Sequence, residues 1–289
     1  MLRYLDNNAS VGRNSPRRRG RGTVNENLAR EIMELHTLGV DGGYTQADVT
    51  AFAAALSGWT AGVWAPAPSD TLGTFFAAEQ HDPGPKRVLG QTYVQDGPDQ
   101  AVAVLRDLAR HPSTIHHVSR RLAAHFLGDD LPPAVLSDLE ETWRRTDGDL
   151  RAVTEALLRR PESTTMAVVK RRPPMEFIMA ACRVLGHAAP AGPLLRDLGA
   201  MGQSVFSANS PKGWPEENNA WVAPDGIRTR LDWSMNVAAR MQDLADPRTL
   251  AEQAFGSVLT EPTRQAIARA ESPKRGIAIL LMSSEMQRR

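Results

Sequence analysis

Residues 25–39 read NENLAREIMELHTLG, and this stretch decides how the chain begins to fold. Its apolar side chains recur at three- and four-residue spacing, which is the pattern of one face of an α-helix. Thr23, followed by Glu26 three residues later, matches a capping box at a helix start, and Gly39 suits the position just beyond a helix end. We therefore predict a helix over 24–38.

A second helix is expected directly after the first. Thr45 and Asp48 match an N-cap and its partner in the first turn, the run TAFAAALS continues the helical pattern, and Gly58 ends it. Only a short Gly-rich connection separates the two helices, and short connections join antiparallel neighbours. The two helices should therefore form an antiparallel pair.

Helix signals dominate the rest of the chain, with one interruption in which the β-prone runs TLGTFFA and RVLGQTYV flank the turn-forming EQHDPGPK. Further helices are predicted over 99–110, 114–127, 133–145, 149–159, 174–186, 191–201, 224–241, 247–255, 261–271 and 273–286. The predicted fold class is mainly α, a multi-helix array with a small β-hairpin-like excursion around 70–95. We expect a single helical domain over 1–289, in which 23–160 and 170–289 could form separate lobes.

The composition is that of an ordinary globular protein. Of 289 residues, 42% are hydrophobic and 23% are charged, and the net charge of +1 provides no field that would recruit nucleic acid or an anionic membrane. The single Cys182 excludes an intramolecular disulfide and a cysteine-based zinc cluster. No run of about eighteen apolar residues is present, and MLRYLDNNAS lacks an apolar signal region, so the sequence as written predicts no transmembrane segment and no signal peptide.

The most biased segment is RNSPRRRGRG at 13–22, which contains five arginines. Such a segment cannot form a core, so we predict an Arg-rich mobile loop at the surface. Arginine clusters attract phosphate, but no aromatic residue is interleaved for stacking on bases. We therefore favour a solvated loop over a nucleic-acid site.

The first predicted helix carries carboxylates and a histidine, which raises the question of a metal or acid–base site. On a regular helix His36 falls within the apolar arc and faces the core, whereas Glu31 and Glu34 fall on the opposite, polar side. Because residues two apart point in opposite directions, Glu34 and His36 cannot chelate one ion. The polar side could be solvated, could pair with arginines, or could offer Glu31 and Glu34 to a divalent cation that has further ligands elsewhere.

Two loops contain further candidate residues. In EQHDPGPK, the side chains of His81, Asp82 and Lys86 could converge for proton transfer or anion binding, although a simple turn is the interpretation we favour. In SPKGWPEENNAW, Trp214 stands in a Pro-rich loop, where tryptophans either cover a core or line a pocket. The candidate catalytic residues are therefore His81, Asp82 and Lys86, and the candidate binding residues are Trp214 and Arg30.

Several blocks, in order along the chain, resemble the bacterial family known as domain of unknown function 1800 (DUF1800). They include NENLAREIMELHTLGVDGGYTQADVTAFAAALSGW, HDPGPKRVLG, GDLRAVTEALLRRPE, KRRPPMEFI, MGQSVF and SPKGWPE, and the resemblance runs from about Leu2 to Arg289. The motif residues that it covers are Asn25, Glu26, Arg30, Glu31, Glu34, Thr37, Trp59, His81, Asp82, Lys86, Gly213 and Trp214. The resemblance implies a largely helical fold and no accepted catalytic activity.

The resemblance also implies a cellular setting. Members of the family often begin with an export signal and lie beside genes for sulfatase-like proteins, which implies an envelope or secreted role and a sulfatase-like partner protein. The family typically has a further helical N-terminal portion before the LRYLDN block, and this chain starts at that block. Its lack of a signal peptide is therefore weak evidence for residence in the cytoplasm, and its localisation stays open.

Two functions from different classes follow from these observations. The first is a non-enzymatic binding or assembly module of the bacterial envelope, which acts with a partner protein. The alternative is a cation-assisted hydrolase that uses Glu31, Glu34, His81 and Asp82. The hydrolase requires the first helix and the HDPGPK turn to meet in one cleft, with carboxylates and imidazole within about 5 Å of one another.

Overall fold

The computed structural model describes residues 1–17, 23–61, 73–166, 169–186, 191–241 and 245–289. Residues 18–22 of the Arg-rich loop and residues 62–72 beside the β-excursion lie outside the described residues. The chain divides into two compact units, which we call unit 1 (Met1–Ala123 with Pro132–Arg160) and unit 2 (Ala124–Leu131 with Pro161–Arg289). The single domain expected from the sequence stays a prediction.

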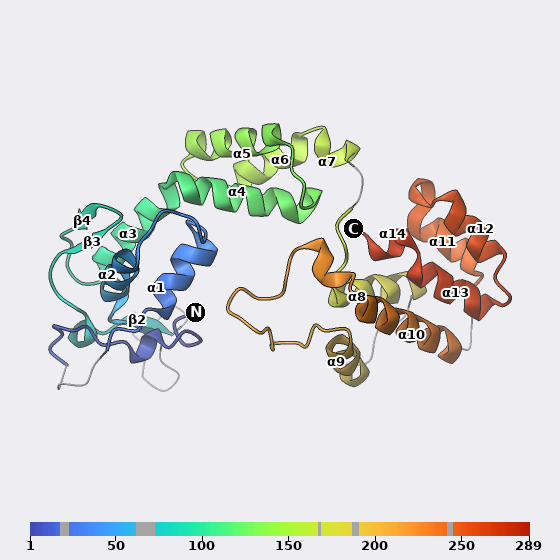
Figure 1. Ribbon diagram of the computed structural model, residues 1–289, viewed down its shortest axis with the longest axis horizontal. Coiled ribbons are helices and arrows are strands. Elements are labelled where there is room, and N and C mark those ends of the chain that lie inside the picture. The colour runs from blue at the N-terminus through green and yellow to red at the C-terminus, as the bar shows by residue number, and fades with distance from the viewer. Residues whose placement is uncertain (18–22, 62–72, 167–168, 187–190, 242–244) are drawn as a thin grey trace. The chain divides into compact units, whose positions relative to one another are not determined.

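Most described elements of unit 1 are helical (Figure 1). In chain order they are η1 (Asn7–Ala9), α1 (Asn27–Glu31), η2 (Ile32–His36), α2 (Gln46–Leu56), β1 (Trp59–Ala61), β2 (Thr74–Phe76), η3 (Ala78–Gln80), β3 (Lys86–Val88), β4 (Gln91–Tyr93), α3 (Pro98–Arg110), α5 (Pro133–Thr146) and α6 (Leu150–Arg159). Helix α4 (Pro112–Leu127) begins in unit 1 and ends in unit 2. The core of unit 1 gathers around α2, where Phe52 is fully buried among Leu28, Met33, Val104 and Leu108.

The first predicted helix forms with an irregular second half. Helix α1 passes directly into η2, a π-helical turn, and its N-cap is Glu26 without a side-chain cap bond, so the predicted capping box at Thr23 is wrong. A π turn holds more residues than an α turn and rotates the side chains that follow it. Met33 is fully buried, whereas His36 is exposed. The prediction that His36 faces the core is therefore wrong.

The second predicted helix matches its sequence signals. Thr45 and Asp48 form the expected capping box, with reciprocal bonds between side chain and backbone. The other oxygen of the Asp48 carboxylate accepts a hydrogen bond from the backbone N–H of Leu89 at 2.7 Å. The start of α2 is thereby fixed to the loop after β3.

The small β-excursion consists of two antiparallel pairs. Strands β3 and β4 form a tight hairpin in which Lys86 pairs with Tyr93, and β1 pairs with β2 so that Trp59 lies opposite Phe76. The rings of Trp59 and Phe76 meet edge to face, with centroids 5.8 Å apart. With these short strands as the only sheet structure in the described ranges, the predicted mainly α fold class is confirmed.

The described secondary-structure elements of unit 2 are helices, and a long loop precedes η4 (Figure 1). Its elements are α7 (Glu162–Thr165), α8 (Pro174–Leu185), α9 (Ala191–Ala200), η4 (Asn218–Trp221), α10 (Pro224–Arg240), α11 (Pro247–Phe255), η5 (Gly256–Val258), α12 (Glu261–Ala268), α13 (Pro273–Met282) and α14 (Ser284–Gln287). The helix predicted over 273–286 is divided at Ser283, whose extended backbone ends α13 and whose hydroxyl caps α14. Phe177, Ile277, Leu281 and Met286 lie at the centre of the core.

A buried arginine connects three parts of unit 2. Arg230 on α10 is only 3% exposed, donates hydrogen bonds to the carbonyl oxygen of Arg172 and to the side chain of Gln287, and stacks over the ring of Phe177. Burial, together with the charge of Arg171, lowers the pKa of Arg230 to about 10. None of the helices in the described ranges combines the length and hydrophobicity needed to cross a membrane.

Candidate functional site

The HDPGPK turn, which contains three predicted site residues, is buried in unit 1. His81 and Asp82 are 4% and 5% exposed, and both bond to Ser57 just after α2. The Nδ1 atom of His81 lies 2.8 Å from the carbonyl oxygen of Ser57, which can only accept, so Nδ1 carries the proton. The Nε2 atom of His81 is buried and lacks a hydrogen-bond partner within the described ranges.

A second loop covers Asp82. The backbone N–H of Asn14 donates to the Asp82 carboxylate at 3.1 Å, and Gly12 approaches so closely that a Cβ atom there would lie 2.5 Å from the Cα of Asp82. The carboxylate therefore fixes a loop, and the loop in turn screens the carboxylate from solvent.

The Lys86 side chain forms hydrogen bonds with the backbone of the same turn. Its Nζ donates to the carbonyl oxygens of Asp82, Pro83 and Gly84 at 2.9, 3.0 and 2.7 Å, so all three ammonium protons have acceptors in the backbone. Burial lowers the pKa of Lys86, although the nearby Asp82 charge opposes this. In this turn, the imidazole Nδ1 of His81, the carboxylate of Asp82 and the ammonium of Lys86 all form hydrogen bonds with backbone groups.

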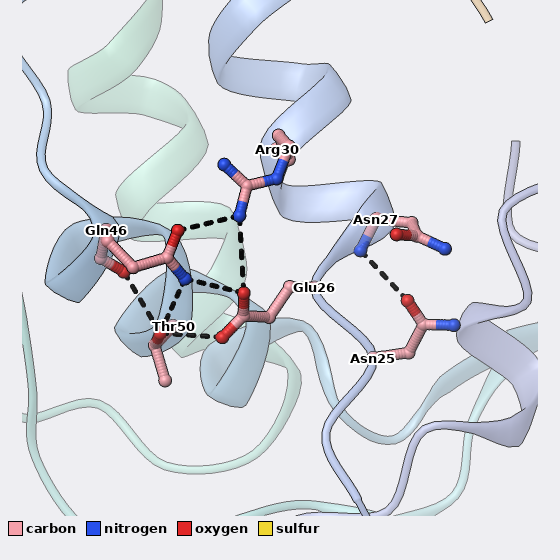
Figure 2. Close-up of polar contacts among 6 residues, drawn as sticks. All are labelled: Asn25, Glu26, Asn27, Arg30, Gln46 and Thr50. Carbon is pink, nitrogen blue, oxygen red and sulfur yellow. Dashed lines mark hydrogen bonds and ion pairs between the residues drawn. The ribbon is translucent and has the colours of Figure 1, made fainter.

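Arg30 belongs to a polar network that joins α1 to α2, as Figure 2 shows. The Glu26 carboxylate accepts hydrogen bonds from Thr50 and Gln46 at 2.7 and 2.6 Å and pairs with Arg30 at 3.4 Å. The guanidinium of Arg30 also donates to Gln46 at 2.7 Å. The bond from Thr50 holds the pKa of Glu26 below its usual value, against partial burial and with help from Gln46 and Arg30.

The order of these bonds gives the direction of the helices. Glu26 meets Thr50, and Arg30, one turn further along α1, meets Gln46, one turn earlier along α2. The expected antiparallel arrangement is therefore present. It places Glu31 and Glu34, which follow Arg30, toward the start of α2.

Glu31 and Glu34 lie near each other but away from the HDPGPK turn. Burial, and then the negative charge of Glu34, raises the pKa of Glu31. His81 and Asp82 are bonded beyond the opposite end of α2, which has 11 residues and a length of about 16 Å. Among the described residues, no group of three or more His, Cys, Asp or Glu side chains is placed to hold a metal ion. The hydrolase hypothesis requires Glu31 and Glu34 to meet His81 and Asp82 in one cleft, and the contacts described above do not bring them together.

The π turn has polar support from two side chains of α4. The carbonyl oxygen of Leu35 accepts hydrogen bonds from His117 Nε2 at 3.2 Å and from Arg121 at 3.3 Å, and the hydroxyl of Thr37 donates to the carbonyl of Ile32. Burial lowers the pKa of His117, although its bond to Leu35 opposes this shift. His117 and Arg121 of α4 therefore supply hydrogen-bond donors to a backbone carbonyl near the end of the irregular helix.

The remaining predicted residue, Trp214, lines a pocket in unit 2. The pocket has a volume of about 400 Å³, within the range of small-molecule sites, and it is formed by the segment that joins α9 to α10. Besides Trp214, its lining includes Asn209, Ser210, Lys212, Glu217 and Trp221. It therefore combines two indole rings with amide, hydroxyl and charged groups.

The two tryptophans of this pocket differ in their surroundings. Trp221 is buried, and its indole N–H donates to the carbonyl oxygen of Pro215 at 3.0 Å. Trp214 is partly exposed, and no acceptor for its indole N–H is found in the described part of the chain. At the exposed side, Lys212 pairs with Glu217 at 3.4 Å. Trp221 is thus bonded within the wall, whereas Trp214 lines the pocket with an indole N–H that has no acceptor among the described residues.

A family model described as "Protein of unknown function (DUF1800)" matches residues 1–288. The chain belongs to this family. No curated protein and no solved structure matches it. The resemblance of the sequence blocks to DUF1800 is therefore confirmed over nearly the whole chain, while the family description assigns no reaction.

The DUF1800 motif residues thus fall into two groups. His81, Asp82, Lys86 and Arg30 have polar partners within unit 1, whereas Trp214 borders an open pocket in unit 2. The catalytic role predicted for the HDPGPK turn and the metal role predicted for Glu31 and Glu34 stay predictions. In this DUF1800 chain, the loop after α9 brings the motif residues Gly213 and Trp214 to the wall of a pocket.

Proposed function

We propose that this protein is a non-enzymatic binding module of the bacterial envelope, whose ligand site is the Trp214 pocket and whose ligand is a neutral sugar unit of a glycan. The pocket carries this proposal, because its aromatic face and uncommitted polar groups lie on one open surface. Sugars present apolar C–H faces that pack on indole rings, and their hydroxyls exchange hydrogen bonds with amides and hydroxyls. Trp214, Asn209 and Ser210 offer these groups.

The ion pair at the pocket also favours a neutral ligand. Lys212 and Glu217 oppose each other in charge, so the lining has no excess of either sign to select an anion or a cation. The backbone N–H of Glu217 itself, and to a smaller extent Lys212, lowers the pKa of the Glu217 carboxyl below its usual value despite partial burial. The carboxylate is therefore charged at neutral pH and available as an acceptor for hydroxyl groups.

The proposal is tested by calorimetric titration of the purified chain with chitotriose and maltotriose. We expect binding in the micromolar to millimolar range that is lost in Trp214→Ala. The matched control is Phe206→Ala, because Phe206 is a fully exposed aromatic residue of the same segment and does not line the pocket. Sugar binding that survives Trp214→Ala unchanged, or no binding of either sugar by the folded wild type, would overturn the proposal.

The partner protein is the second part of the proposal. The family setting supports a sulfatase-like protein as the partner, and a module that holds a glycan would bring such a protein to its substrate. Co-purification of the tagged chain from its native cells, followed by mass spectrometry for a sulfatase-like protein, provides the test. We expect a complex that persists in the Trp214→Ala variant, since partner and sugar would use different surfaces.

The competing hydrolase makes a different prediction about metal. Elemental analysis of the untagged chain, after incubation with zinc, manganese and calcium and removal of excess ions, separates the two functions. The binding module is expected to retain no stoichiometric metal. Near-stoichiometric metal that is lost in both Glu34→Ala and His81→Ala, with folding intact by circular dichroism, would establish a shared cation site and favour the hydrolase.

A further inference from the structure

A second pocket in unit 2 lies between α8, α11 and α14, separate from the Trp214 pocket. It has a volume of about 510 Å³. Its walls include three methionines, Met175, Met179 and Met286, together with Phe255 from the end of α11. Met286 is fully buried and forms part of the inner wall, whereas Met179 is 41% exposed and stands toward solvent. Methionine side chains are flexible and polarisable, and such walls adapt to unbranched apolar chains.

The charges around this pocket do not cancel. Arg172, Glu176 and Arg183 line it, and Glu176 already pairs with Arg289 at 2.9 Å. The Nη1 atom of Arg172 donates to the carbonyl oxygens of Glu285 and Met286, so this side chain is held in place by backbone. The lining therefore has a net positive charge once the Glu176 carboxylate is neutralised by its partner.

Arg183 is the lining cation that is available to a ligand. It is exposed, and within the described residues its side chain has no ion-pair partner. It stands on α8 seven residues after Glu176, which corresponds to about 10 Å along the helix. Met179 and Ala180 lie between these two positions and line the same pocket. The lining of this one pocket thus contains the Arg183 guanidinium, the apolar side chains of Met179 and Ala180, and the buried Met286.

We infer that this pocket binds an anionic amphiphile, a carboxylate that carries a single unbranched acyl chain. The carboxylate pairs with Arg183, and the acyl chain packs along Met179 and reaches toward Met286. This site is independent of the Trp214 pocket and goes beyond the proposed function, because it shares no lining residue with the Trp214 pocket. A positively charged head group on the same chain is disfavoured by the net charge of the lining.

Calorimetric titration with dodecanoate below its micelle concentration tests this site. We expect one dodecanoate per chain, at least about tenfold weaker binding of dodecyltrimethylammonium, which has the same tail and the opposite charge, and no measurable binding of acetate, which lacks the tail. Equal binding of the anionic and cationic amphiphiles, or no binding of dodecanoate by the folded wild type, would overturn the inference.

Two matched pairs of variants locate the site. Arg183→Gln should weaken dodecanoate binding about tenfold or more, whereas Arg269→Gln, which changes another exposed arginine of unit 2, should not. Met179→Trp should block the pocket, whereas Met235→Trp, at an equally exposed methionine on α10, should leave binding unchanged. All four positions are exposed, so the variants are expected to fold, and circular dichroism checks this. Dodecanoate affinity that is unaltered in both Arg183→Gln and Met179→Trp would place binding elsewhere and refute the inference.

Discussion

The HDPGPK turn of unit 1 and the Trp214 loop of unit 2 look alike in sequence and differ in structure. Both combine Pro and Gly with residue types common at functional sites. In the turn, His81 Nδ1, the Asp82 carboxylate and the Lys86 ammonium bond to backbone groups, whereas Trp214 borders a pocket. The difference teaches that similar loop motifs can place their polar side chains differently, against backbone groups in one loop and beside a pocket in the other.

The largest expected effect is a difference in stability loss between alanine variants of the two tryptophans that line the Trp214 pocket. Trp221→Ala should lower the free energy of unfolding of unit 2 by about 3 kcal/mol or more, because it removes a buried indole and its bond to Pro215. Trp214→Ala should cost less than about 1 kcal/mol. Denaturant unfolding followed by circular dichroism measures both, and equal losses would show that Trp214 is also a structural residue.

The next effect tests whether the HDPGPK turn is structural. Gly12→Ala should destabilise unit 1 by about 2 kcal/mol, because the new Cβ would overlap the backbone of Asp82. Gly192→Ala on α9 is the control, since its Cβ would meet no neighbouring atom and alanine favours a helix. Thermal melts compare the two variants. Unchanged stability in Gly12→Ala would mean that the loop over Asp82 is loosely held.

A third effect concerns acid, and it belongs to unit 2. Burial raises the pKa of Glu285, but hydrogen bonds from Thr260, Ser284 and its own backbone outweigh it and lower the pKa to about 2. Because the folded pKa is depressed, Glu285 stabilises the fold above its unfolded pKa of about 4.5, and this contribution is lost as the pH falls toward about 2.

Comparison of Glu285→Gln with the wild type across this pH range tests the assignment. At pH 7 the variant should be less stable by about 1–2 kcal/mol, and the difference should become small near pH 2, where about half of the wild-type carboxyl is protonated. Urea unfolding at several pH values measures it. A difference that stays constant with pH would mean that the loss arises from packing.

The smallest expected effect is a loss of stability in the HDPGPK turn. Lys86→Met should cost about 1 kcal/mol, because three backbone carbonyls lose their donor but lie close enough to the surface for water to replace it in part. Stability is measured as for Gly12→Ala, and any activity found for the protein should be retained. A variant that keeps full stability but loses an activity would instead support the catalytic role predicted for Lys86.

The sequence by itself determined most of the helical architecture. Thr45 and Asp48 cap α2 as predicted, because a capping box is a local contact between residues three apart. The β-excursion is likewise signalled by local turn residues and β-prone runs. The Trp214 loop was also recognisable as a candidate pocket, since an aromatic residue in a Pro-rich loop has few local reasons to be there.

Only the tertiary structure decided the rest. The π turn that exposes His36 is supported by His117 and Arg121, more than eighty residues away, and no local pattern at 32–36 indicates it. The partners of Asp82 and His81 come from loops that are 68 and 24 residues distant along the chain. A sequence shows which groups could react, but burial and hydrogen bonding depend on contacts between remote segments, and these contacts determine which groups stay available.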